Sequence, residues 1–152
     1  MATVAAALPV SVQGLSARLV ENGAGTYQAD FKVPANATLV DIVIEGVALW
    51  AAATSAVLDI GDSGAAQGYF AALNVKATDL LAGETISIGS TQVRGGAGGS
   101  YLTVGTSTHI TRGFSNAERT ITAKVTSVGA GATGDTRVTV VYAVGSPTVI
   151  TQ

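Results

Sequence analysis

The stretch Ala56-Val-Leu-Asp-Ile-Gly-Asp-Ser-Gly-Ala-Ala-Gln-Gly-Tyr-Phe-Ala-Ala-Leu-Asn-Val-Lys76 decides the fold class of this chain. Two apolar runs typical of β-strands, Val57–Ile60 and Tyr69–Val75, flank an acidic, glycine-rich connection. Asp and Gly are residues that tight turns between antiparallel strands favour. The stretch therefore predicts a β-hairpin.

Alternation of apolar and polar residues with a period of two, the main sequence signal of a strand, recurs on both sides of this hairpin. Before it, residues 26–33 form one such segment, which Pro34 ends because proline cannot donate to a sheet. In a second segment we expect Val40, Ile42 and Ile44 on one face and Asp41, Val43 and Glu45 on the other. After the hairpin, the same signal predicts strands at Thr85–Ile88, Tyr101–Val104, His109–Arg112, 120–126 and 138–144.

Helix signals are few. Val47–Ala56 is expected to form a short helix, and Thr78–Gly83 a single helical turn that ends at a glycine. The sequence therefore predicts an all-β fold, an antiparallel jelly roll or β-sandwich of about eight strands. We expect residues 1–12 to form an N-terminal arm and residues 13–152 a single domain.

Charged residues make up only 12% of the chain, about half of the ~25% typical of soluble domains. Such a charge-poor surface tends to associate, so we expect copies of the chain or a larger assembly to cover it. The chain has no basic patch of the kind that binds nucleic acid. It also has no apolar run of the ~20 residues needed to cross a membrane. Neither nucleic acid nor a membrane is therefore an expected partner.

Motifs of enzyme or cofactor chemistry are incomplete. Gly129-x-Gly131-x-x-Gly134 matches a dinucleotide-binding fingerprint, but a strand pattern follows where the fingerprint needs a helix. His109 is the single histidine and cysteine is absent, which excludes multi-histidine and thiolate metal centres. No Gly-x-Ser-x-Gly motif marks a nucleophile. We therefore expect no catalytic residue, cofactor or metal, and His109 is interpreted as a strand or loop residue.

Two features stay open at this point. Asp59 and Asp62 are hard oxygen ligands that suit a cation such as Ca²⁺, or else they are solvated carboxylates of the turn. The full loop pattern of a calcium site is missing from the sequence. Trp50, the single tryptophan, is either a core residue or an interface anchor.

The Val33–Gly46 and Leu58–Ala72 segments resemble jelly-roll decoration proteins, also called cement or auxiliary head proteins, of tailed-bacteriophage capsids. The resemblance implies a non-enzymatic structural protein on the outer surface of the virion. It also implies a homotrimer at three-fold or quasi-three-fold positions that binds the major capsid protein and bridges capsomers.

The apolar N-terminal arm offers a capsid contact through Thr3, Val4, Leu8, Pro9 and Val10. Such an arm is able to lie along a partner or to add a strand to it. The alternative is a terminus without a partner.

Two further functions remain as alternatives. A carbohydrate-binding or adhesive module would use exposed aromatic rings, and the candidates are Trp50, Tyr27, Tyr69, Tyr101 and Tyr142. A small trimeric β enzyme that hydrolyses nucleotides would need ordered Asp, Arg and Ser motifs, and the sequence contains no such set.

Overall fold

The computed structural model describes residues 10–88, 98–103, 109–110 and 112–145. The strands are β1 (Ser11–Val20), β2 (Gly25–Val33), β3 (Ala37–Ala48), β4 (Ser55–Asp62), β5 (Ala65–Asn74), β6 (Thr85–Ser87), β7 (Leu102–Thr103), β8 (His109–Ile110), β9 (Phe114–Ser115), β10 (Arg119–Val128) and β11 (Asp135–Val144). None of the described residues is helical, so no helix among them is long and apolar enough to cross a membrane.

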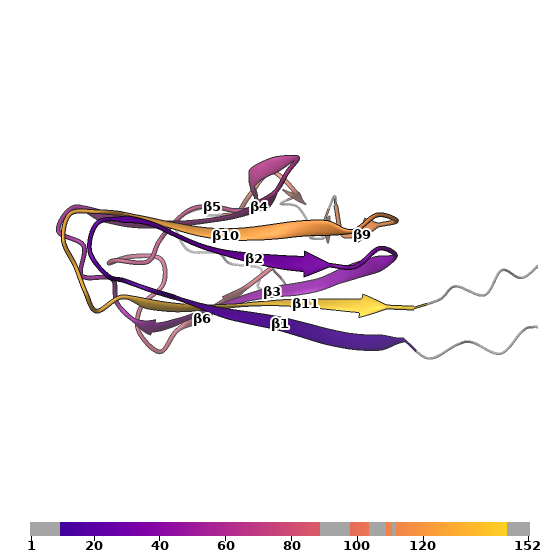
Figure 1. Ribbon diagram of the computed structural model, residues 1–152, viewed down its shortest axis with the longest axis horizontal. Coiled ribbons are helices and arrows are strands. Elements are labelled where there is room, and N and C mark those ends of the chain that lie inside the picture. Colours follow the sequence, from indigo (N-terminus) through magenta and orange to yellow (C-terminus); the bar gives the residue numbers. More distant parts are fainter. Residues whose placement is uncertain (1–9, 89–97, 104–108, 111, 146–152) are drawn as a thin grey trace, which may run out of the picture.

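Two antiparallel sheets pack face to face (Figure 1). The first, which we call sheet A, has the order β1-β11-β3-β6, with β9 beside β3. The second, sheet B, has the order β2-β10-β4-β5, and β7 and β8 form a small separate ladder. The predicted all-β sandwich is therefore confirmed.

The predicted hairpin is also confirmed. β4 and β5 pair antiparallel, and Ser63 and Gly64 form the turn between Asp62 and Ala65. β5 is less regular than the sequence suggested. Ile60 lies opposite Phe70 and Leu58 opposite Leu73, so β5 carries an extra residue between these pairs.

The core lies between the sheets and is built mainly of aliphatic side chains. In β10 every second side chain from Arg119 to Ser127 is buried, as the alternation predicted. Fully buried side chains include Ile42, Ile44, Leu58, Ile60, Ile121, Ala123, Val125, Val138 and Val140. The strand predicted before Pro34 behaves in the same way, with Phe31 and Val33 buried and Lys32 exposed.

Val40 corrects the expected faces of β3. Ile42 and Ile44 are buried as predicted, but Val40 is 51% exposed and Leu39 is buried instead. Leu39 lies opposite Tyr142 and Asp41 opposite Val141, so Val40 is an extra residue in a β-bulge. A bulge shifts the alternation by one position. Val47, also exposed, is the extra residue at a second irregularity of the same strand.

Both predicted helices are wrong. β3 continues to Ala48 and β4 begins at Ser55, with a loop between them where a helix was expected. This loop contains the buried Trp50, and its backbone bonds to a neighbouring strand, with Thr54 N donating to Val128 O of β10 at 3.0 Å. Residues 78–83 form turns, in which the NH groups of Asp79 and Leu80 bond to Asn74 O rather than to a helical partner.

β1 is a strand that the sequence analysis missed. It begins at Ser11, inside the segment expected to be an arm, and pairs along its whole length with β11. Ser11 lies opposite Val144, so the first and last described strands meet at one end of the sandwich (Figure 1). We call this the terminal end. The opposite end, formed by residues 21–24, 49–54 and 129–134, we call the loop end.

Candidate functional site

The outer face of sheet A presents a row of uncharged residues at the terminal end. Val12 lies opposite Ala143, Ala143 opposite Thr38, and Thr38 opposite Phe114. Strands are about 4.8 Å apart, so the row is roughly 15 Å wide. Phe114 is 61% exposed and Val12 is 66% exposed.

Two more exposed apolar side chains lie at the same end. Val10 precedes β1 and is 61% exposed. Its side chain lies against Gly145, since a Cβ added to Gly145 would stand 3.2 Å from Val10 Cγ2. Val40 is the extra residue of the bulge in β3, and its side chain is exposed. We call Val10, Val12, Val40 and Phe114 the terminal patch. Clusters of exposed apolar side chains on soluble proteins mark contact sites.

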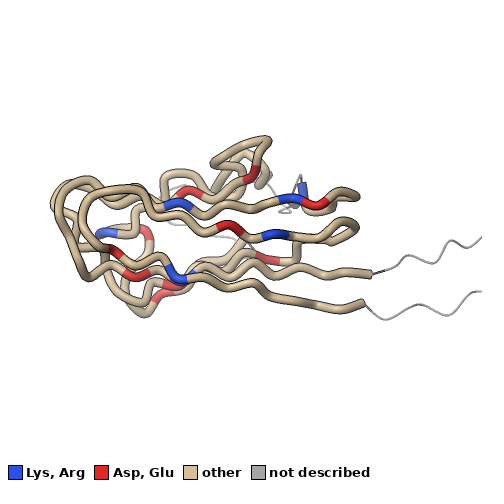
Figure 2. Tube along the Cα trace, in the orientation of Figure 1, with Lys and Arg blue, Asp and Glu red and all other residues tan. Residues whose placement is uncertain are grey.

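Two ion pairs of this sheet lie toward the loop end, whereas Asp41 of β3 lies nearer the terminal end, opposite Val141 (Figure 2). The Arg18 guanidinium forms an ion pair with Asp135, and Arg137 Nη2 donates to Glu45 Oε1 at 2.7 Å. The hydrogen bond from Arg137 lowers the pKa of Glu45. Between these pairs and the terminal patch the face carries small and hydroxyl side chains, such as Ser16 and Thr139, which hydrogen-bond at 3.0 Å.

A buried polar network lies behind the turn of the β4–β5 hairpin. Asp62 Oδ1 accepts hydrogen bonds from Gly64 N at 2.8 Å and from Tyr101 Oη at 2.7 Å. Asp62 Oδ2 lies 3.5 Å from Arg112 Nε, and only 1% of the Asp62 side chain is exposed. Asp62 is thus a turn residue, as one of the two alternatives held, but it is buried rather than solvated.

Tyr69 and Arg119 extend this network. Arg119 Nη2 donates to Gly113 O at 2.8 Å and Nη1 donates to Tyr69 Oη at 3.2 Å. Burial raises the pKa of Tyr69 to about 12, against the opposing effect of the nearby Arg119 charge. Burial, followed by the hydrogen bond to Asp62, also raises the pKa of Tyr101. These groups hold segments together that are far apart in the sequence.

Asp59 has a different role from Asp62. Its Oδ1 accepts from Gln67 Nε2 at 2.8 Å and from Ala72 N at 2.9 Å. Ala72 has φ of 53°, a conformation that costs energy for a residue with a Cβ, so this bond holds the irregular part of β5. Among the described residues no three metal-ligating side chains cluster, and both carboxylates are engaged by protein donors.

Two hollows open beside β10 on the outer side of sheet B. One, of about 600 Å³, is lined by Asp62, Arg112, Glu118, Arg119, Thr122 and Lys124, and the other, of about 460 Å³, by Asp59, Gln67, Gly99 and Lys124. The larger hollow mixes both signs of charge with hydroxyl groups. Ligand pockets are usually mostly apolar with few polar groups, and this lining does not fit that description.

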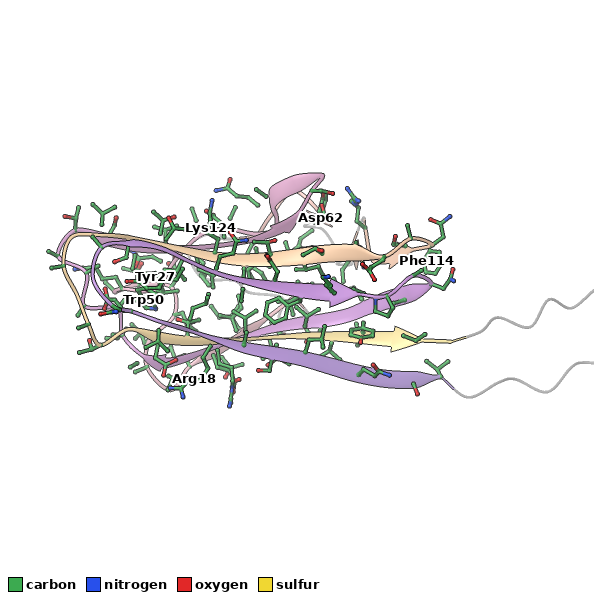
Figure 3. The ribbon with its side chains drawn as sticks, in the orientation of Figure 1. Arg18, Tyr27, Trp50, Asp62, Phe114 and Lys124 are labelled. Carbon is green, nitrogen blue, oxygen red and sulfur yellow. The ribbon has the colours of Figure 1, made fainter. Side chains whose placement is uncertain are left out.

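Trp50 lies in the core, the first of its two predicted alternatives. It is 2% exposed, its Nε1 donates to Thr136 Oγ1 at 2.9 Å, and its ring meets Tyr27 edge to face (Figure 3). The indole therefore offers almost no surface to a partner. His109 lies in β8 opposite Thr103, which agrees with its interpretation as a strand residue.

The glycines of the apparent dinucleotide motif have a packing role. A Cβ on Gly131 would lie 2.3 Å from Glu21 Oε1, and one on Gly134 would lie 2.5 Å from Trp50 Cγ. Gly129 has φ of 90°. The loop therefore needs glycine to close over Glu21 and Trp50, and β11 follows it, as the strand pattern predicted.

Of the predicted capsid-contact residues, only Val10 is described, and it belongs to the terminal patch. Thr3, Val4, Leu8 and Pro9 lie outside the described residues. Sequence reasoning missed Phe114 and Val40. A lone phenylalanine in a loop-rich stretch gives no sign of its exposure, and the bulge that exposes Val40 depends on the pairing with β11.

No protein-family model and no curated protein sequence matches this chain. A chain of the cyanophage Pam1 capsid asymmetric unit has a similar structure, with a TM-score of 0.59 and 19% identity over 95% of this chain and 93% of that one. A chain of the acidic stable capsid structure of Helicobacter pylori bacteriophage KHP30 gives a TM-score of 0.49, with 13% identity over 87% of this chain and 95% of that one. A chain of the capsid of Ralstonia phage GP4 gives a TM-score of 0.46, with 17% identity over 97% of this chain and 92% of that one. The first likeness shows a shared fold, the antiparallel β-sandwich.

Proposed function

We propose that the protein is a non-enzymatic structural component of a phage virion that binds the outside of the capsid as a homotrimer and bridges capsomers. The observation that carries the proposal is the terminal patch, an exposed apolar cluster at the end of a sheet whose two ion pairs lie toward the other end. The fold shared with a chain of the cyanophage Pam1 capsid supports it, as does the resemblance of the Val33–Gly46 and Leu58–Ala72 segments to decoration proteins.

The terminal patch is the proposed capsid contact because the predicted arm leads directly into it. Val10 is the last of the proposed arm residues, and it packs on Gly145 beside Val12. The arm and the patch therefore meet the same partner. A trimer that presents three such contacts to a lattice gains affinity through effective concentration, without any single strong contact.

The homotrimer is proposed to form through the middle of the outer face of sheet A. This area carries Val141, Asp41, Val43 and Ser87, which lie in register on the adjacent strands β11, β3 and β6, and only Asp41 is charged. Small side chains allow three such faces to meet closely around a three-fold axis. The low charge content of the chain agrees with a surface that is largely covered in the assembly.

The carbohydrate-binding alternative is not supported by the five aromatic residues that the sequence analysis named for it. Tyr69 is fully buried, Tyr101 and Tyr142 are 9% and 5% exposed, and Trp50 is 2% exposed. Tyr27 is partly buried and its hydroxyl donates to Gly23 O at 2.7 Å. These rings hold the sandwich together and are not available to stack on sugars.

The test of the proposal is co-sedimentation with shells assembled from the major capsid protein encoded near this gene. The F114S and V12S variants are expected to bind about tenfold more weakly each, since each removes buried apolar area from the contact. Val128→Ser is the matched control, because Val128 is an exposed valine near the loop end. Equal binding by V12S and V128S would contradict the assignment of the terminal patch.

Deletion of residues 1–10 tests the arm separately. Weaker binding is expected, and unchanged binding would leave the contact to the patch alone. A virion that contains no copy of the protein would overturn the proposed function as a whole.

A further inference from the structure

β1 is an open sheet edge of ten residues. It pairs with β11 on one side, and none of the described residues pairs with it on the other. Its sequence, Ser11-Val-Gln-Gly-Leu-Ser-Ala-Arg-Leu-Val20, contains one charged residue and no proline. Long edge strands with few charges are templates for pairing with another chain.

The other sheet edges carry the protection that β1 lacks. β2 presents Asp30 and Lys32 and is followed by Pro34. β5 is interrupted by the bulge at Ala72, and β6 has only three residues. Charges, proline, bulges and short length are the devices that keep edges from pairing. β1 carries only one of them, the charge of Arg18, which is paired with Asp135 of the neighbouring strand, and this indicates that the edge is used.

The occupant that fits β1 is β1 of a second copy, in antiparallel orientation about a two-fold axis. When the two-fold axis passes through a residue of the strand, the side chains on the outer face of one copy lie opposite side chains on the outer face of the other copy. An axis at Ser16 sets Val12 opposite Val20 of the second copy and Gly14 opposite Arg18 of the second copy. Val12 and Val20 are 66% and 52% exposed in the protomer, so this register places one exposed valine beside another.

Charge excludes one register and is compatible with an axis at Ser16. Like charges directly opposite one another destabilise a sheet, so an axis at Arg18 is unfavourable. An axis at Leu15 would place the charged Arg18 opposite the apolar Val12 of the second copy. With the axis at Ser16, the Arg18 side chain lies across Gly14, which has no side chain to displace, and keeps its hydrogen bond to Asp135 Oδ1 at 3.1 Å.

We propose that β1 pairs antiparallel with β1 of a second copy, with the two-fold axis at Ser16, so that two copies of sheet A join into one continuous sheet. This contact does not depend on the proposed binding to a capsid. It is two-fold, whereas the proposed trimer is three-fold, so it joins one trimer to the next. An icosahedral shell contains axes of both kinds.

Disulfide trapping tests the register, because the chain has no native cysteine. Ser16→Cys places the two thiols opposite one another, and mild oxidation is expected to give a covalent dimer of twice the chain mass on a denaturing gel. Gly14→Cys is the matched control on the same strand and face. Its two copies would stand four residues apart, about 13 Å, beyond the ~7 Å that a disulfide spans.

Thr139→Cys is a second control, on the neighbouring strand of the same face. Its two copies would be three strand spacings apart, about 14 Å. We expect the trapped fraction of S16C to exceed that of both controls by about fivefold or more, since neither control distance can be bridged. Equal trapping of S16C and G14C would overturn the register, and no trapping of any variant would overturn the pairing.

Charge exchange gives an independent readout. S16K and S16E each set like charges opposite one another at an exposed position, so each alone is expected to lose the two-fold contact. A mixture of the two is expected to regain it, with one copy of each variant in every pair by native mass spectrometry. If S16K alone assembles as the wild type does, the proposal fails, whatever the outcome of the capsid-binding test.

Discussion

The Glu21 carboxylate accepts a hydrogen bond of 3.0 Å from the backbone NH of Gly134, 113 positions away in the sequence. The same carboxylate oxygen accepts from Ala51 N at 2.8 Å and from Thr133 N at 3.3 Å, and Ser127 Oγ bonds to the other oxygen. Glu21 is 3% exposed. One buried carboxylate thus joins the three loops of the loop end.

Replacing Glu21 by Gln is expected to lower the free energy of unfolding by about 2 kcal/mol, since hydrogen bonds to a charged acceptor are the stronger kind. Glu118→Gln is the control, because Glu118 is exposed, and its effect should stay within about 0.5 kcal/mol. Urea denaturation at a fixed protein concentration measures both. Equal effects would show that the loops close without the carboxylate.

Glu21 also predicts the direction of a pH dependence. Burial on its own raises the pKa of Glu21, but the NH groups of Ala51, Gly134 and Thr133 outweigh it, so the pKa in the folded protein is lowered. Its contribution to stability is therefore present above the unfolded pKa and is lost as the pH falls through the folded pKa. Stability of the E21Q variant should fall less steeply in this acidic range than that of the wild type.

Gly134→Ala should destabilise the protein by about 2 kcal/mol or more, as overpacking does, because the added Cβ would stand 2.5 Å from Trp50 Cγ. Gly14→Ala is the matched change. Its Cβ would have only Thr139 Cγ2 at 3.7 Å, so a gain of about 0.5 kcal/mol is expected for a strand glycine. Thermal unfolding followed by fluorescence of the single tryptophan distinguishes the two, and a neutral G134A would contradict the close packing.

Tyr69 predicts a loss of stability at alkaline pH. Its folded pKa of about 12 lies above the ordinary value of 10, so the contribution is complete below pH 10 and is lost as the pH rises toward 12. The Y69F variant cannot ionise, so between these values the wild type should lose about 1 kcal/mol more per pH unit than Y69F does. Chemical denaturation at several alkaline pH values gives both slopes. Parallel slopes would contradict the burial of the phenol.

The bulge at Val40 is tested by two identical substitutions. Val40→Thr should change stability by no more than about 0.5 kcal/mol, as surface changes do, because Val40 is 51% exposed. Val138→Thr places a hydroxyl in the core, where the valine is fully buried, and should cost about 1 to 3 kcal/mol. Comparable losses at both positions would mean that Val40 faces the core after all.

The sequence predicted the long strands of both sheets except β1, and it also missed the two-residue strand β9. β10 alternates buried apolar residues with threonine and lysine, so its faces can be read directly. β1 alternates over Leu15-Ser-Ala-Arg-Leu19, but Val12 and Val20 stand on its outer face and Ser11 and Gln13 on the opposite one, so the pattern is lost at both ends of the strand.

The roles of Asp62 and Val40 depend on residues far away in the chain. Asp62 stands in a turn, where local rules predict a solvated carboxylate, and Tyr101 and Arg112 bury it. Val40 is exposed because β11 pairs with its neighbours and skips it. Contacts between residues that are far apart in the chain leave no signal in the local sequence pattern. That pattern predicted the sandwich but not which residues form the terminal patch.

The meeting of the first and last strands at the terminal end has a practical consequence for attaching foreign sequences. Ser11 and Val144 are paired, so a fusion at either terminus would start from the end that is proposed to face the capsid. Residues 22–24 connect β1 and β2 at the other end of the sandwich and are largely exposed. A peptide inserted there would point away from the contact, which makes this turn the natural place to display an epitope or a label.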